Sequence, residues 1–165
     1  MIRHAIESDC VDIAALALHV WLHTYATQGV RSRISNYALS TLTEQHFIDS
    51  LEQPSIDIWI YEHNEHLVGF VVVDLNAKCT EFPNAGYEIM TLYVSPHFSR
   101  QGIGRRLLES IEIRHGSPFW LSTWVNNENA ISFYQHLGLT VIGERHFDLE
   151  GERHRNHIFM KASTW

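Results

Sequence analysis

Hydrophobic residues recur at two different spacings along the chain, and the changes of spacing divide it into strands and helices. Alternating or continuously apolar runs predict strands at residues 2–6, 56–62, 67–75, 87–94, 119–125, 140–149 and 157–162. Apolar residues three or four positions apart predict helices that begin near Asp9, Thr43 and Gly102 and a last one over 130–137. Asp9 is expected to cap the first helix, and the polar stretch after Tyr25 is expected to be irregular. This order predicts an α+β fold, a mixed sheet flanked by helices.

Length and composition indicate one domain. The 165 residues, 45% of them hydrophobic, suffice for a core and show no linker or repeat, so we expect a single domain over residues 1–165. Early charge in Met1–Glu7 argues against a secretory signal, and the longest apolar run, Leu67–Val73, is too short to span a membrane. Cys10 and Cys79 form no disulfide framework, which suits a reducing compartment. We therefore expect a cytoplasmic protein that no membrane segment anchors.

The charge balance and the histidines bear on the partners. Twelve basic residues against 19 acidic residues give a formal charge of −7, which argues against nonspecific nucleic-acid binding and favours a cationic partner. The 12 histidines are scattered, and the closest pairs are His63/His66 at a predicted turn and His154/His157 on a predicted strand. Strand residues three positions apart face opposite sides, which is poor geometry for shared ligation. We expect no metal site.

The segment from Ser99 to Arg105 contains two glycines one residue apart. They follow a strand stopped by Pro96 and precede a helical repeat, so we expect them on the first turn of a helix. Main-chain amides at such a turn are free, and a residue without Cβ lets a phosphate approach the backbone. Further donors around the turn are Arg100, Gln101, Arg105 and Arg106. Taken alone, the segment is explained more simply as a tight turn with solvated arginines.

This segment resembles the coenzyme A signature of the GCN5-related N-acetyltransferase (GNAT) family. In that signature Gln or Arg, two variable residues, Gly, one variable residue and then Gly or Ala open the central helix, and here Ser99 occupies the Gln/Arg position. The resemblance implies the acyl-CoA N-acyltransferase fold, a mixed and mostly antiparallel sheet flanked by helices. It also implies acetyl-CoA as the cosubstrate and transfer of an acetyl group to an amine.

A second segment, Asn127 to Leu139, resembles a later motif of the same family, Asn-x-x-Ala followed by an aromatic-Tyr pair and a Gly. Periodicity alone explains it as an amphipathic helix that ends at Gly138, with Tyr134 as a core aromatic. In many family members the tyrosine that matches Tyr134 is positioned to protonate the departing thiolate. The resemblance therefore implies a catalytic acid, and the core interpretation stays open.

Glu88 is the candidate base. On an alternating strand it shares its face with Met90, Leu92 and Val94, and burial among apolar neighbours raises the pKa of a carboxylate. An amine is protonated at neutral pH and must lose a proton before it attacks a thioester. The resemblance places Glu88 where a catalytic glutamate lies in some members, acting directly or through water. An ion-pair partner at the strand edge is the alternative interpretation.

In the family fold, the strands that hold Glu88 and residues 120–125 splay apart, and the pantetheine arm pairs with the backbone of the first strand. The resemblance therefore implies a set of cofactor contacts at Leu92, Tyr93, Val94, Arg100, Gln101, Gly102, Ile103, Gly104, Arg105, Asn127 and Tyr134.

The second half of the chain is most similar to bacterial polyamine (spermidine/spermine) N-acetyltransferases, so a small cationic amine is the first expected acceptor. Candidate residues at the acceptor mouth are Trp21, Tyr25, Tyr37, Glu81 and Glu88. A protein N-terminus or lysine, an aminoglycoside and an amino acid are alternative acceptors. A noncatalytic acyl-CoA-binding regulatory module is a different class of function, against which the presence of both a candidate base and a candidate acid argues. A homodimer is one expected assembly.

Overall fold

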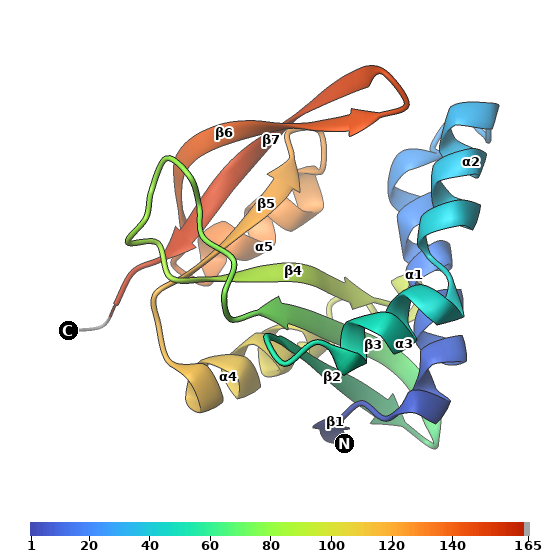
Figure 1. Cartoon of the computed structure of the whole chain (residues 1–165), viewed down its shortest axis with the longest axis horizontal. Helices are drawn as coiled ribbons and strands as arrows, with labels where there is room; N and C mark the ends of the chain where they lie inside the picture. Colours follow the sequence, from blue (N-terminus) through green and yellow to red (C-terminus); the bar gives the residue numbers. More distant parts are fainter. Residues whose placement is uncertain (164–165) are drawn as a thin grey trace.

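The protein is described by a computed structural model over residues 1–163, in which helices cover both faces of one seven-stranded sheet (Figure 1). The strands are β1 (Ile2–His4), β2 (Ile56–His63), β3 (His66–Asp74), β4 (Tyr87–Val94), β5 (Phe119–Trp124), β6 (Thr140–Leu149) and β7 (Glu152–Lys161). The helices are η1 (Glu7–Asp9), α1 (Cys10–Tyr25), α2 (Ser32–Thr41), α3 (Glu44–Glu52), η2 (Pro96–Phe98), α4 (Ile103–His115) and α5 (Glu128–His136). The predicted mixed sheet flanked by helices is confirmed.

The sheet has the order β1-β2-β3-β4-β5-β7-β6, and every neighbouring pair is antiparallel except β4 and β5. These two parallel strands pair only at Tyr87 with Phe119 and at Glu88 with Trp120. Beyond that point they diverge, as Figure 1 shows, and β5 pairs along its length with β7 instead. The edge of β4 that faces β5 is therefore open over its second half.

Apolar stripes on the helices explain how the two faces of the sheet are covered. On one face, α4 buries Leu107 and Ile111 in a cluster with Phe119, Tyr134 and Phe159. The opposite face of β2 and β3 packs against α1 and α3, whose buried residues include Ile13, Ala17 and Phe47. The first helix, predicted to begin near Asp9, is thus confirmed with its apolar side against the sheet. Burial of these side chains is the main driving force for the fold.

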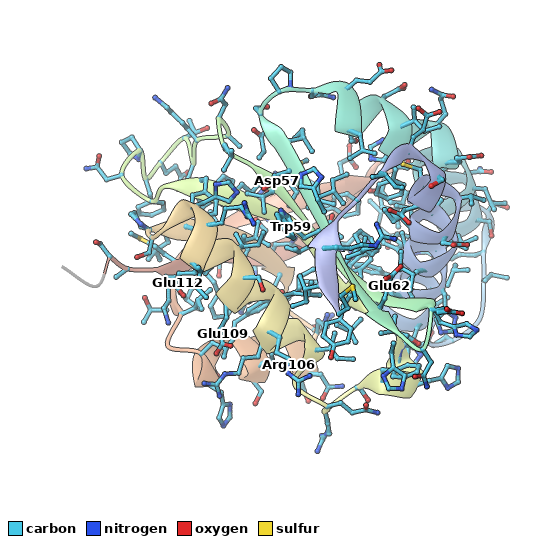
Figure 2. All side chains as sticks on the ribbon, turned by 90° about the horizontal axis from the view of Figure 1, so that it is seen from below. Asp57, Trp59, Glu62, Arg106, Glu109 and Glu112 are labelled. Carbon is cyan, nitrogen blue, oxygen red and sulfur yellow. The ribbon has the colours of Figure 1, made fainter. Side chains whose placement is uncertain are left out.

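Polar contacts join α4 to the first two strands on the face that Figure 2 presents. Asp57 on β2 lies between two histidines, with Oδ1 2.6 Å from Nε2 of His4 and Oδ2 2.7 Å from Nε2 of His115. Nearer the start of α4, Arg106 donates to the Tyr61 hydroxyl at 2.8 Å. These contacts tie both ends of α4 to β2.

No helix within residues 1–163 combines the length and apolarity needed to cross a bilayer.

Three local predictions are wrong. The stretch expected to be irregular contains α2, which buries Ile34 and Ala38 and is tied to β7 where Arg31 Nη2 donates to Glu152 Oε1 at 2.7 Å. Strand β7 begins at Glu152, five residues before the expected 157, because it pairs with the whole of β6. Asp9 stands at the N-cap of α1 without capping it through its side chain, since its carboxylate accepts from Arg3 and from the Ile6 amide.

A bulge at Met90 interrupts the regular alternation of β4. Val72 on β3 pairs with Thr91, whereas its neighbour Val73 pairs with Ile89, so Met90 is an extra residue on β4. A bulge of this kind moves every later side chain to the opposite face of the sheet.

The bulge changes the neighbours of Glu88. Leu92 and Val94 pack in the same cluster as Ile89, beneath α4, while Tyr93 packs on the opposite face against Phe70. The prediction that Glu88 shares a face with Met90, Leu92 and Val94 is therefore wrong. Its face of β4 continues with Thr91 and Tyr93.

Candidate active site

The glycine segment forms a tight turn with free main-chain donors. Arg100 and Gly102 have positive φ, 60° and 78°, and Gly102 is the N-cap of α4. The first closing bond of the helix runs from the Arg106 amide to the Gly102 carbonyl. Within residues 1–163, the main-chain amides of residues 100–105 donate no hydrogen bond. A curled backbone with several free amides at the positive end of a helix dipole is a typical anion site.

Gly102 and Gly104 are required for different structural reasons. A Cβ added at Gly102 would meet no atom within 4 Å, so this position needs glycine for its left-handed backbone and leaves the space above it open. A Cβ at Gly104 would lie 3.2 Å from Cζ of Phe133, so this glycine lets α5 pack closely on α4. The predicted first-turn position of the glycines is correct to within a residue.

The neighbouring arginines divide into two groups. Arg105 donates through Nε to Glu109 at 2.7 Å, and Arg106 is held by the Tyr61 hydroxyl. Both side chains thus have partners along or beside α4. Arg100 is exposed and makes no hydrogen bond or ion pair within residues 1–163. Of the predicted cations, Arg100 is the one whose side chain has no competing protein partner.

A cleft of about 550 Å³ opens where β4 and β5 diverge, and it is closed at the sides by α1, α2, α5 and β6. It brings together five of the predicted site residues, Glu88, Leu92, Tyr93, Asn127 and Tyr134. Trp21, Tyr25 and Tyr37, predicted at the acceptor mouth, line the same cleft, whereas Glu81 lies in the loop before β4 and does not line it. Val94 and the glycine segment lie outside its lining.

Glu88 stands opposite Trp120, at the last residue pair before the two strands separate. Its side chain is 19% exposed. Burial raises the pKa of this carboxyl above 4.5, Arg145 lowers it, and Asp74 on the neighbouring strand raises it again. The net direction is upward, which is the change that makes a carboxylate a better proton acceptor.

Arg145 is a site residue that sequence reasoning missed. Its Nη1 atom lies 3.9 Å from Glu88 Oε1, and its guanidinium carbon lies 5.7 Å from the centre of the Trp120 ring. Arg145 belongs to β6, an edge strand of the sheet, where it shares a row with Asn156 on β7 and Trp124 on β5. The sequence placed Arg145 on a predicted strand, but only the order of the strands shows that it lies beside Glu88.

Tyr134 is buried in α5, at 8% exposure, and its ring packs against Phe133 and Phe159. Its side chain also lines the cleft, and no hydrogen bond holds its hydroxyl within residues 1–163. Burial raises the pKa of this phenol, which keeps it protonated at neutral pH. Tyr134 is therefore a core aromatic that also lines the cleft and keeps its hydroxyl proton at neutral pH.

Asn127 begins α5. Its Oδ1 accepts from the Ala130 amide at 3.2 Å, the capping contact expected of Asn at a helix start. Among residues 1–163, no group of three or more His, Cys, Asp or Glu side chains is arranged to hold a metal ion.

Aromatic rings from both sides of the cleft meet at the end that α1, α2 and β6 line. Tyr25 lies 5.0 Å from Trp124, and Tyr37 lies 4.9 Å from Trp21 and 5.3 Å from Phe147, measured between ring centres. We call these five residues the aromatic cluster. It joins α1 and α2 to β5 and β6 and gives this end of the cleft an apolar wall.

Comparisons with known proteins agree with this geometry. The family model for the acetyltransferase (GNAT) family matches residues 16–139. An uncharacterized N-acetyltransferase in the pepI 3' region of Lactobacillus delbrueckii subsp. lactis is 25% identical over 161 residues, which is 94% of this chain and 93% of that protein. The N-alpha-acetyltransferase RimI of Mycobacterium tuberculosis is 31% identical over 80 residues, about half of each protein (48% and 49%).

Among solved structures, the PaiA N-acetyltransferase of Thermoplasma acidophilum in complex with coenzyme A has the same fold, with a TM-score of 0.72. Its sequence is 22% identical, and the match covers 95% of this chain and 96% of that one. The family model covers most of the chain, including the glycine segment and the helix with Tyr134. The chain therefore belongs to the acetyltransferase (GNAT) family, as the two motifs indicated.

Proposed function

We propose that this protein transfers an acetyl group from acetyl-CoA to a primary amine, with Glu88 as the base and Tyr134 as the acid. The observation that carries the proposal is that one cleft holds a half-buried carboxylate and a buried phenol where β4 and β5 separate. The free amides of residues 100–105 complete the arrangement.

The residues present fit acetyl-CoA. Free amides and the open space at Gly102 suit a diphosphate, and Arg100 can add a charge-assisted contact. The unpaired edge of β4 at Leu92 to Val94 suits a linear chain with amide groups, which would take the place of a neighbouring strand. When bound, acetyl-CoA supplies an activated acetyl group as a thioester.

Two side chains of the cleft can move the protons that the reaction requires. Glu88 takes a proton from the ammonium group of the acceptor, directly or through a water, and the free amine can then form the new C–N bond. Tyr134 can give its hydroxyl proton to the sulfur as the C–S bond breaks, so that the thiol leaves neutral, and the proton that the nitrogen loses as the amide forms can return to the tyrosinate. A free thiol has a pKa of about 8.5, so a nearby donor assists its departure.

The acceptor is a small amine in this proposal. A free amino acid is one alternative, and a polyamine is the class that the sequence resemblance implies. Two carboxylates, Asp74 and Glu88, and the aromatic cluster support it, because cations and methylene chains bind such surfaces. The name of RimI favours a protein N-terminus as the alternative, although the chain matches only about half of that relative.

Thiol release from acetyl-CoA in the presence of spermidine, simple amines and a peptide with a free N-terminus tests the proposal. We expect turnover with at least one amine and calorimetric binding of acetyl-CoA without it. Binding without any thiol release would favour a noncatalytic acyl-CoA-binding module. An absence of heat at millimolar acetyl-CoA would overturn the assignment of the diphosphate site.

A further inference from the structure

We propose that Arg145 binds a carboxylate on the acceptor, and that the preferred acceptors are α-amino acids. This inference rests on the proposed acetyl transfer and names its substrate class. It starts from a cation that stands inside the cleft beside the candidate base.

The guanidinium of Arg145 lies over the Trp120 ring and keeps its hydrogen-bonding capacity. The face of Trp120, which is 3% exposed, lies 5.7 Å from its central carbon. At 3.9 Å, Glu88 is beyond hydrogen-bond distance, and Arg145 makes no side-chain hydrogen bond within residues 1–163. Guanidinium N–H groups are arranged to bind a carboxylate through two parallel hydrogen bonds, so this side chain is ready for an anionic group.

Further polar atoms without partners lie on the same face of the sheet. Trp120 Nε1, Ser122 Oγ and Asn156 Oδ1 are buried, and none has a hydrogen-bond partner within residues 1–163. Asn156 pairs with both Trp124 and Arg145 in the strand register, so these three residues form one row across the sheet. Buried polar groups without partners are costly, and since Ser122 and Asn156 line the cleft, a polar group bound there is the nearest source of partners for these two residues.

The spacing selects the class of acceptor. The carboxylate of Glu88 and the guanidinium of Arg145 are next to each other, so their ligand must carry its ammonium and its anionic group close together. In an α-amino acid one carbon separates these groups. The ammonium can face Glu88 while the carboxylate faces Arg145, and each protein charge then gains an opposite partner. A diamine would instead bring a second cation toward Arg145, which is unfavourable.

Matched pairs of acceptors that differ by one carboxylate test the inference. Thiol release is measured with phenylalanine and phenethylamine, and with lysine and cadaverine. Phenylalaninamide keeps the shape of phenylalanine but has a neutral amide in place of the carboxylate. We expect kcat/KM to be about ten- to a hundredfold higher for each amino acid than for its decarboxylated partner, the usual strength of a charged hydrogen bond. Cadaverine also represents the polyamine alternative.

Arg145→Gln should bring these ratios close to one, and Arg145→Lys should keep part of the preference. Arg155→Gln is the matched control, since Arg155 is a similarly exposed arginine on the same hairpin. Its neighbour in the chain, Asn156, faces the cleft, so Arg155 lies on the other face of the sheet. The control substitution removes the same charge from the opposite face and should keep the wild-type ratios.

Equal or better turnover of the decarboxylated amines, or of a peptide N-terminus, would overturn the inference and leave the proposed acetyl transfer intact. So would ratios that do not change in Arg145→Gln. Calorimetry with phenylalanine on protein saturated with coenzyme A separates the remaining case. Binding that Arg145→Gln weakens, without thiol release by any acceptor, would support the carboxylate site and refute the acetyl transfer.

Discussion

Gly102 and Gly116 stand at the two ends of α4 with nearly the same positive φ, 78° and 76°, and a Cβ at either would meet no atom within 4 Å. They differ in ψ, 9° at Gly102 and −163° at Gly116, and in their surroundings. Gly102 borders the free amides of residues 100–105, whereas the Gly116 carbonyl accepts a hydrogen bond from the Tyr87 hydroxyl. Alanine substitutions at the two positions can therefore distinguish the effect of backbone strain from an effect on ligand binding.

Gly102→Ala should weaken acetyl-CoA binding by about tenfold or more, because a methyl group would occupy the space through which a phosphate approaches the backbone. Its positive φ should also cost about 1–2 kcal/mol of stability. Gly116→Ala should lose at least as much stability and keep the wild-type affinity. Denaturant unfolding and calorimetry measure both quantities, and an equal loss of affinity in the two variants would contradict the phosphate site.

Glu88→Gln should remove the acid limb of the pH profile of kcat/KM. The pKa of Glu88 is raised, first by burial, so the wild-type enzyme loses its base as the pH falls through that raised pKa. Glutamine cannot take up a proton in this range, and the remaining activity should be low and independent of pH there. An acid limb that survives the substitution would assign the base to another group.

Neutral substitutions of the two charged neighbours of Glu88 should shift the acid limb of the pH profile in opposite directions. Arg145 lowers the pKa of Glu88 and Asp74 raises it, so Arg145→Gln should shift the limb to higher pH and Asp74→Asn should shift it to lower pH. The profiles are measured with phenethylamine, an acceptor without a carboxylate. Shifts of the same sign in both variants would exclude direct electrostatic tuning of Glu88.

The glycine segment and the helix with Tyr134 could be predicted because their signals are local. The position of the glycines predicted the start of α4 to within a residue, and the helical spacing of apolar residues over 130–137 predicted α5. The polar surface of α2 concealed that helix, since only Ile34 and Ala38 are buried in it.

Contacts between distant strands could not be predicted in the same way. The bulge at Met90 arises from the pairing of β4 with β3, so the alternation of β4 alone gave the wrong face for Leu92 and Val94. Likewise, the contact between Arg145 and Glu88 depends on the pairing of β6 with β7 and of β7 with β5, which sets the face and row of Arg145. Charge and hydrophobic spacing along one strand carry no information about either relationship.

Tyr134→Phe should lower kcat by about a hundredfold while acetyl-CoA affinity changes little, because it removes a proton donor and keeps the ring. Tyr87→Phe is the matched control, since both tyrosines are buried and burial raises the pKa of both. The Tyr87 hydroxyl donates to the Gly116 carbonyl at 2.7 Å, so its loss should cost about 1 kcal/mol of stability and no turnover. Unchanged kcat in Tyr134→Phe would leave this residue a purely structural role.

Asp57→Asn should destabilise the fold by about 1–3 kcal/mol at neutral pH, because Asp57 holds His4 on β1 and His115 on α4. Burial raises the pKa of Asp57, but the hydrogen bonds and charge of its neighbours, those of His115 and His4 among them, outweigh burial and lower it below 3.8. A lowered carboxyl pKa gives stability that is fully present above pH 3.8 and is lost as the pH falls through the folded-state value. The difference between Asp57→Asn and the wild type in urea unfolding should therefore shrink below that pH.

Asp49→Asn, on the exposed side of α3, should stay within about 0.5 kcal/mol of the wild type throughout. A cost of Asp57→Asn that grows on acidification would show that the carboxylate is not the stabilising form.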